Sequence, residues 1–172
     1  YFVRMDGDDL CHPERFERLV RFMDDHAEIG ACSSAIRTFG VSEEVWKYGT
    51  DPEYNNASLI FIHPIGHASS IFRTSVLKKN NIQYEDNFWR MEDYWLFYRL
   101  RHYTKITSIP DPLYLYRREH YNTNAEIEVK KNVEIRKFYE MILSELGLSN
   151  DAKAVSVHMQ LAGREAPEFS YR

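Results

Sequence analysis

The hydrophobic pattern of the N-terminal part of the chain predicts a strand, an acidic turn, a helix and a second strand. Residues 1–3 are apolar and β-prone, so we expect a short buried strand over residues 2–5, with a turn formed by the Asp and Gly residues at its carboxyl end. Pro13 suits the first turn of a helix, and apolar residues then recur at helical spacing to about His26. Residues 29–36 are mostly small, which predicts a strand that another backbone or a ligand can approach closely.

Later segments continue the alternation of short strands and helices. Residues 38–58 mix polar, aromatic and Gly or Pro residues without a period, so we expect a surface excursion there. Further strands are expected at residues 59–63, 69–72, 105–109 and 113–117. Further helices are expected at residues 74–79, from Glu92 onward, at 127–146 and at 151–161. This order predicts an α/β fold.

The composition of the chain argues against several classes of protein. The chain has 172 residues, 44% of them hydrophobic, which is enough for one domain with a sizeable core. Its formal net charge of -4 gives no basic excess to hold a nucleic-acid backbone, so we expect no nucleic-acid partner. The two cysteines, Cys11 and Cys32, are too few for a disulfide scaffold, and no apolar run is long enough to span a bilayer. We therefore expect a cytoplasmic protein.

Asp6, Asp8 and Asp9 crowd three carboxylates into one turn. Like charges this close need a cation, hydrogen-bond donors or protonation to coexist. Mg2+ prefers one or two carboxylates together with phosphate oxygens, so a divalent-ion site is one interpretation. A solvated turn that caps the following helix is the alternative. An EF-hand is excluded, because Cys11 stands where that loop requires glycine.

Glu92 and Asp93 begin a predicted helix, where backbone N–H groups favour negative charge. Helix capping is therefore one interpretation of this pair. The other is a general base, which needs a carboxylate within reach of an acceptor hydroxyl. Trp89 and Trp95 would then form the apolar wall on which sugar rings stack, although packing in the core explains aromatic residues equally well.

Two further groups of residues have weaker patterns. His63 and His67 are spaced like zinc ligands on a helix, but Pro64 and Gly66 between them argue against a helix. Arg117 and Arg118 follow a predicted strand and could meet a diphosphate. Charge pairing at the surface is the alternative for these arginines.

Taken together, these segments resemble the signature of family 2, GT-A fold glycosyltransferases, in order and spacing. They resemble, in turn, the stretch that closes the family's nucleotide domain, its acceptor-side strand and helix, its catalytic helix, and its Y-R-x-H-like end. They read RMDGDDLCHPERFERLVRFM, HASSIFRTSVLKK, MEDYWLFYRL and LYLYRREH. The resemblance covers residues 1–124 and implies a partial GT-A fold, a mixed sheet flanked by helices, whose N-terminal nucleotide-binding repeats are missing here. Residues 125–172 are expected to form a C-terminal helical segment that could contact a partner or the inner face of the membrane.

The resemblance also implies roles on the donor side. Asp6 and Asp8 would hold Mg2+ or Mn2+ and contact the nucleotide, and Asp9 would lie near the diphosphate. Arg117 or Arg118 would offset the charge that develops on the leaving phosphate. The expected donor is a nucleotide-sugar, most simply a UDP-sugar.

On the acceptor side, the resemblance implies that Asp93 is the base that deprotonates the acceptor hydroxyl, with Glu92 orienting it. The acceptor would be a glycan or a lipid-linked sugar, attacked with inversion at the anomeric carbon. The residues expected to contact it are His67, Ser69, Trp89 and Trp95. Two other functions remain open: a non-catalytic glycan-binding or assembly fragment, and a metal-dependent hydrolase that uses Asp6, Asp8 and Asp93.

Overall fold

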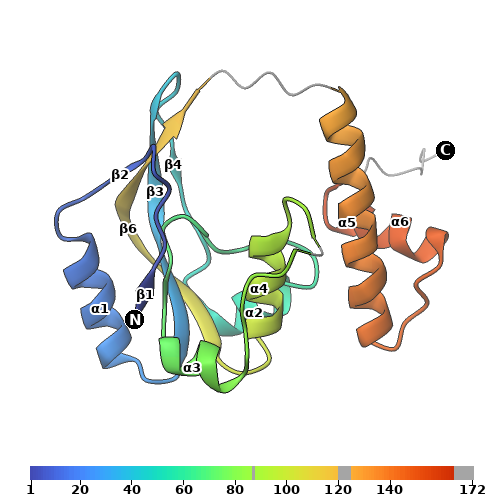
Figure 1. Ribbon diagram of the computed structural model, residues 1–172, viewed down its shortest axis with the longest axis horizontal. Coiled ribbons are helices and arrows are strands. Elements are labelled where there is room, and N and C mark those ends of the chain that lie inside the picture. The colour runs from blue at the N-terminus through green and yellow to red at the C-terminus, as the bar shows by residue number, and fades with distance from the viewer. Residues whose placement is uncertain (87, 120–124, 165–172) are drawn as a thin grey trace.

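The computed structural model describes residues 1–86, 88–119 and 125–164, and its centre is a mixed sheet (Figure 1). The strands are β1 (Phe2–Val3), β2 (Leu10–Cys11), β3 (Ile29–Gly40), β4 (Val45–Trp46), β5 (Ile71–Phe72) and β6 (Lys105–Arg118). The helices are α1 (Arg15–Asp25), α2 (Pro52–Ser58), α3 (Thr74–Lys79), α4 (Glu92–Leu100), α5 (Ala125–Glu145) and α6 (Ala152–Leu161). The strands follow the order β1-β5-β3-β6-β2, and β4 pairs with β3.

The long strands β3 and β6 run parallel at the middle of the sheet, and every other pairing is antiparallel. The two strands predicted at residues 105–109 and 113–117 are in fact one strand. Ser34 of β3 pairs with Ile109 of β6, but the next residue of β3, Ala35, pairs with Pro112, so the register of the pairing shifts there. A proline has no N–H to donate to the ladder, so the pairing skips residues there without ending the strand.

Helices cover both faces of the sheet (Figure 1). Successive residues of β3 point to opposite faces, so Ala31 and Cys32 belong to different hydrophobic clusters. The cluster around Cys32 includes Leu19 and Met23 of α1. The cluster around Ala31 includes the buried residues of α4, from Tyr94 to Leu100. The sheet is therefore sandwiched between α1 and α4.

The C-terminal helices α5 and α6 lie beside α4, on the side away from the sheet (Figure 1). Phe138 of α5 is fully buried and belongs to the same cluster as Trp95 and Tyr98 of α4. The hydroxyl of Tyr98 also donates to Glu145 at 2.8 Å. No helix in the described ranges is long and apolar enough to cross a membrane.

Most helices lie where the sequence predicts them, but three further predictions for other segments are wrong. Residues 2–5 form only the short β1, at the edge of the sheet, where Phe2 is 43% exposed instead of buried. Residues 38–58 are more than a surface excursion, since they contain the end of β3, β4 and α2. Asp51 caps α2, accepting hydrogen bonds from the N–H groups of Glu53 and Tyr54, and Pro52 occupies its first turn.

The strand predicted at residues 59–63 is also absent. The N–H groups of Phe61 and Ile62 both donate to the carbonyl of Ser58 at 2.8 Å, so helical turns continue past the end of α2. Leu59 is fully buried, but in the cluster beneath α4 and not in a sheet. The apolar run therefore marks burial in the core, which periodicity alone does not distinguish from a strand.

Candidate active site

The acidic turn between β1 and β2 is fixed in place by Asp9. Its side chain is 6% exposed and accepts two hydrogen bonds at 2.7 Å, one from the hydroxyl of Tyr114 and one from the backbone N–H of Arg117. Both donors belong to β6. Asp9 therefore joins the turn to the sheet, and this buried, fully engaged carboxylate is an anchor more than a ligand.

Asp6 and Asp8 are the carboxylates of the turn that remain open to a ligand. Asp8 is exposed, and its backbone carbonyl accepts a hydrogen bond from the Arg117 side chain at 2.8 Å. Asp6 is half-buried and accepts a hydrogen bond from the guanidinium of Arg4. The hydroxyl of Tyr114 accepts from the N–H of Asp6 at 3.0 Å, so the backbone is held on both sides of Gly7.

The donor set of this turn fits a divalent ion that is completed by a substrate. Within the described residues, no three His, Cys, Asp or Glu side chains are grouped so as to hold a metal by themselves. Mg2+ commonly takes only one or two protein carboxylates and fills its other positions with phosphate oxygens and water. Asp8 suits that role as it stands, and Asp6 can share its charge between an ion and Arg4.

Asp93 lies at the start of α4, with 31% of its side chain exposed. One of its oxygens accepts a hydrogen bond from the N–H of Tyr94 at 2.7 Å. The other oxygen faces the Nδ1 atoms of His63 and His67, at 3.8 and 3.9 Å. Glu92 is exposed, and in the described part of the chain no hydrogen bond joins it to Asp93, so contacts do not support its predicted orienting role.

His67 lies beside Asp93, and the charge of Asp6 in the acidic turn acts on the same imidazole. Its Nε2 atom lies 2.7 Å from the hydroxyl of Tyr84. Burial lowers the pKa of His67, the charges of Asp93 and Asp6 raise it, and the charge of Arg4 lowers it further. Asp6 and Arg4 precede β2, whereas Asp93 begins α4, so residues far apart in sequence act on the same imidazole.

The arginines predicted to meet a diphosphate are the last two residues of β6. Arg117 places its guanidinium 4.8 Å from the centre of the Phe39 ring while bonding to Asp8. Arg118 lies 5.5 Å from the ring of Trp46. Arg117 is thus positioned at the acidic turn, and Arg118 is directed toward β4.

The residues predicted to contact an acceptor separate into two groups. Trp89 is half-buried and lines a cavity of about 320 Å³ together with Phe88, Arg90 and Glu92. Ser69 and Trp95, in contrast, are buried, at 0% and 7% exposure. Because these two residues are so little exposed, they offer little surface for a sugar to contact.

Internal hydrogen bonds explain both buried residues. The Ser69 hydroxyl bonds to the carbonyls of Ser34 and Gly66, and the Trp95 indole N–H donates to Glu85 at 2.9 Å. Their predicted contact with an acceptor is therefore corrected to a role in packing.

Comparisons with known proteins identify the family of the chain. The sequence profile of glycosyl transferase family 2 matches residues 1–123. The chain belongs to glycosyl transferase family 2. Its relatives include an uncharacterized glycosyltransferase of Haemophilus influenzae, 22% identical over 151 residues, covering 80% of this chain and 46% of that protein. The amylovoran biosynthesis glycosyltransferase AmsE of Erwinia amylovora is 30% identical over 121 residues, covering 64% of this chain and 42% of AmsE.

Solved structures confirm the predicted fold. S. aureus TarS, residues 1–349, matches with a TM-score of 0.58 and 16% identity, covering 93% of this chain and 45% of that one. TarS in complex with UDP matches with a TM-score of 0.53 and 18% identity, covering 82% and 44%. The chain therefore spans less than half the length of the relatives it matches.

Some residues of this candidate site have no functional signal in the sequence. They are Tyr114, Tyr84 and Arg4, while the spacing of His63 indicates only a zinc ligand. Tyr114 lies opposite Cys11 in the β2–β6 pairing, so its place beside the acidic turn depends on a long-range register. The spacing of His63 and His67 around a Pro-Gly turn was the one signal available for that pair.

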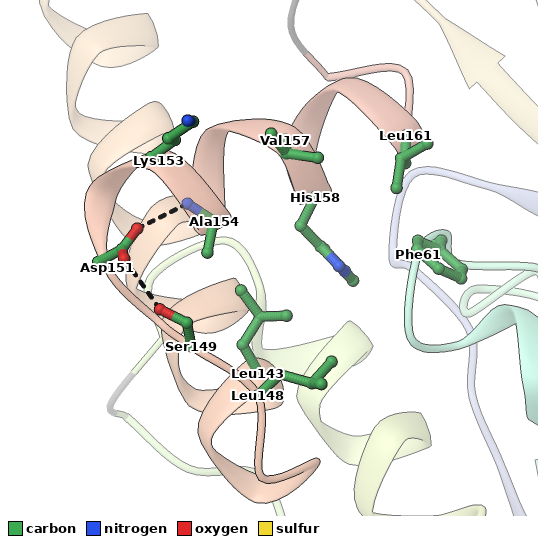
Figure 2. A pocket seen from close by; sticks show the side chains of 10 residues that line it. All are labelled: Phe61, Leu143, Leu148, Ser149, Asp151, Lys153, Ala154, Val157, His158 and Leu161. Carbon is green, nitrogen blue, oxygen red and sulfur yellow. Dashed lines mark hydrogen bonds between the residues drawn. The ribbon is translucent and has the colours of Figure 1, made fainter.

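A second cavity lies away from these residues, between the end of α5, α6 and Phe61 (Figure 2). It has a volume of about 490 Å³, and its lining is largely apolar. His158 points into the space beside Phe61, stacks on that ring at 4.7 Å, and lies 2.6 Å from the carbonyl of Ile60. None of the residues predicted to act in glycosyl transfer lines it.

Proposed function

We propose that the intact protein transfers a sugar from a nucleoside diphosphate donor, most simply a UDP-sugar, to a hydroxyl group of a glycan or lipid-linked acceptor. The observation that carries this proposal is the environment of His67, which lies 3.9 Å from Asp93 and whose pKa is also raised by the charge of Asp6 in the acidic turn. Transfer needs a base near the acceptor and charge compensation near the diphosphate, and these two regions supply them from separate segments of the sequence.

On the donor side, Asp8 and Asp6 would hold Mg2+ or Mn2+ against the diphosphate. Such an ion, when bound, supplies positive charge that stabilises the leaving group. Arg117 adds a fixed cation, because its bond to the Asp8 carbonyl holds the guanidinium beside the turn. Asp9 contributes by keeping the turn on β6.

On the acceptor side, Asp93 takes the proton from the attacking hydroxyl. The oxygen then bonds to the anomeric carbon as the bond to the diphosphate breaks, and the electron pair of that bond leaves with the nucleotide. A direct displacement of this kind inverts the anomeric configuration. Trp89 and the cavity beside Glu92 offer a surface for the acceptor ring next to Asp93.

The relatives suggest a cellular context for this reaction. AmsE is named for amylovoran biosynthesis, and TarS was solved in complex with UDP. By analogy, we place the protein in the assembly of a surface polysaccharide on the cytoplasmic side of the membrane, where residues 125–172 would contact a partner or the membrane surface.

The test uses the intact protein with Mn2+ and a panel of UDP-sugars and other nucleotide-sugars. We expect release of the nucleoside diphosphate that depends on both metal and acceptor. Asp93→Asn should lower kcat by about 10²- to 10⁴-fold, the usual contribution of a general base. Asp25→Asn is the matched control, since Asp25 is exposed on α1 and should change nothing.

Two outcomes would contradict the proposal. Full transferase activity in Asp93→Asn would remove the assignment of the base. Release of free sugar in the absence of an acceptor, at the rate seen with one, would favour the hydrolase over the transferase.

A further inference from the structure

The carboxylate of Asp93 lies between two imidazoles whose function the transfer reaction leaves unexplained. The Nδ1 atoms of His63 and His67 approach the same oxygen at 3.8 and 3.9 Å, and both imidazoles are largely buried, with 18% of each side chain exposed. These distances exceed a direct hydrogen bond, but catalytic contacts are often long before substrate binds and shorten in the complex.

The surroundings of the two rings favour a proton on Nδ1 of each. The Nε2 atom of His67 lies 2.7 Å from the hydroxyl of Tyr84, so it can accept from that hydroxyl while Nδ1–H points at Asp93. The Nε2 atom of His63 is buried without a hydrogen-bond partner among the described residues. An N–H there would be an unsatisfied donor, and the proton is better placed on Nδ1, facing Asp93.

This arrangement also determines which part of the carboxylate is left for a substrate. A carboxylate has about four lone-pair directions on its two oxygens. The N–H of Tyr94 occupies one of them at 2.7 Å, and the two histidines face two more. One direction remains, and with 31% of the side chain exposed it is accessible from outside.

We propose that His63 and His67 are positioning residues for the base, which hold the Asp93 carboxylate from two sides and leave one lone pair for the acceptor hydroxyl. This inference rests on the proposed function. The hydroxyl of Tyr84 is hydrogen-bonded to the Nε2 atom of His67, on the side of the ring away from Nδ1. Tyr94 and Phe97 pack against His63, each with its ring centre 5.2 Å from the imidazole. A base oriented by a further group in this way is a common feature of catalytic sites.

Both imidazoles need to be neutral for this role, because an imidazolium would form an ion pair with Asp93 and compete with the acceptor hydroxyl. Burial is the main cause that lowers the pKa of each histidine. Asp93 raises the pKa of both, as do Asp6 and Glu92 for His67. Arg4 lowers the pKa of His67, and the charges of His67 and Arg164 lower that of His63.

The test compares two amides at position 67 in the intact protein. The amide N–H of asparagine can replace Nδ1–H, whereas that of glutamine reaches the position of Nε2, next to Tyr84. We expect His67→Gln to lower kcat by about 10- to 100-fold with the donor KM within about twofold, and His67→Asn to recover about 10-fold of that loss. His63→Asn and His63→Gln should show the same order. A purely structural role would instead favour glutamine, which is closer in size and keeps a partner for Tyr84.

The pH profile of kcat gives an independent readout. Asparagine does not titrate, so the acid side of the profile should be less steep in His67→Asn than in the wild type. His102→Asn is the control, because that histidine is exposed beyond the end of α4 and should leave kcat and its profile unchanged.

The outcomes separate this inference from the proposed function. If the wild type transfers sugar and Asp93→Asn does not, but His67→Gln equals or exceeds His67→Asn, the positioning role is wrong and the function stands. If the wild type shows no transfer with any donor, the proposed function itself fails. Thermal unfolding of each variant identifies losses of kcat caused by misfolding. If the His67 variants are misfolded, the comparison of His63→Asn with His63→Gln tests the positioning role instead.

Discussion

His63 makes a quantitative prediction about stability and pH. Burial lowers the pKa of this imidazole from 6.5 to about 4, with the charge of Asp93 acting in the opposite direction. In the unfolded chain the imidazole is exposed to water and titrates near its ordinary pKa. As the pH falls below about 6.5, the unfolded state therefore binds a proton that the folded state does not bind. The free energy of unfolding decreases until the pH reaches about 4.

The magnitude follows from the two pKa values. Each pKa unit corresponds to about 1.4 kcal/mol, so between about pH 7 and pH 4.5 this residue should lower the free energy of unfolding by about 2.5 kcal/mol. His63→Phe removes the titration and keeps an aromatic ring against Tyr94 and Phe97, whose ring centres lie 5.2 Å from the imidazole. The loss attributable to residue 63 should then disappear.

Urea-induced unfolding of the intact wild type and His63→Phe, followed by tryptophan fluorescence at the two pH values, measures this difference. All other titrating groups are common to the two proteins, so only the difference between their pH dependences matters. The wild type should lose about 2.5 kcal/mol more than the variant between about pH 7 and pH 4.5. If the difference between the two proteins is the same at both pH values to within about 0.5 kcal/mol, His63 is not held neutral by burial.

Other predictions concern the acidic turn and the turn before β5. Tyr114→Phe should cost about 1–3 kcal/mol in urea unfolding, because buried Asp9 loses one donor; an unchanged midpoint would show that the bond contributes little. Gly66→Ala should cost about 1–3 kcal/mol, since its Cβ would lie 2.6 Å from Tyr48, while Gly7→Ala, with nothing within 4 Å, should be nearly neutral. Asp8→Asn should weaken Mn2+-dependent transfer without lowering the melting temperature, because Asp8 is exposed; equal Mn2+ titration curves would refute its role.

The fold was predictable where the signal is local. Apolar residues at helical spacing identified α1, and the acidic pair Glu92-Asp93 marked the start of α4. The errors arose where long-range pairing decides. Leu59 is apolar because it lies in the core beneath α4, and no local pattern separates that environment from a strand. Residues flanking Pro112 likewise join one strand only because β3 provides a partner on both sides of the register shift.

The candidate site was predictable in its residue types more than in its contacts. The order of the motifs predicts that Asp6, Asp8 and Asp93 belong to one site, and in the structure the charges of Asp6 and Asp93 both act on His67. It did not reveal that Asp9 is buried against β6, since an exposed and a buried carboxylate are identical in sequence. Trp95 illustrates the same ambiguity, because a stacking wall and a packed core both favour aromatic residues.

The bonds of Asp9 have a consequence for how the protein is made. They join the turn to residues of β6 that follow it by 105 and 108 positions. During synthesis, Asp8 is therefore among the first of these residues to leave the ribosome, yet its turn cannot adopt its final shape until β6 has emerged and paired with β3. Closure of so long a loop is an intrinsically slow event. We therefore expect the acidic turn, the proposed donor side of the site, to form late in folding, after the strands of the central sheet have paired.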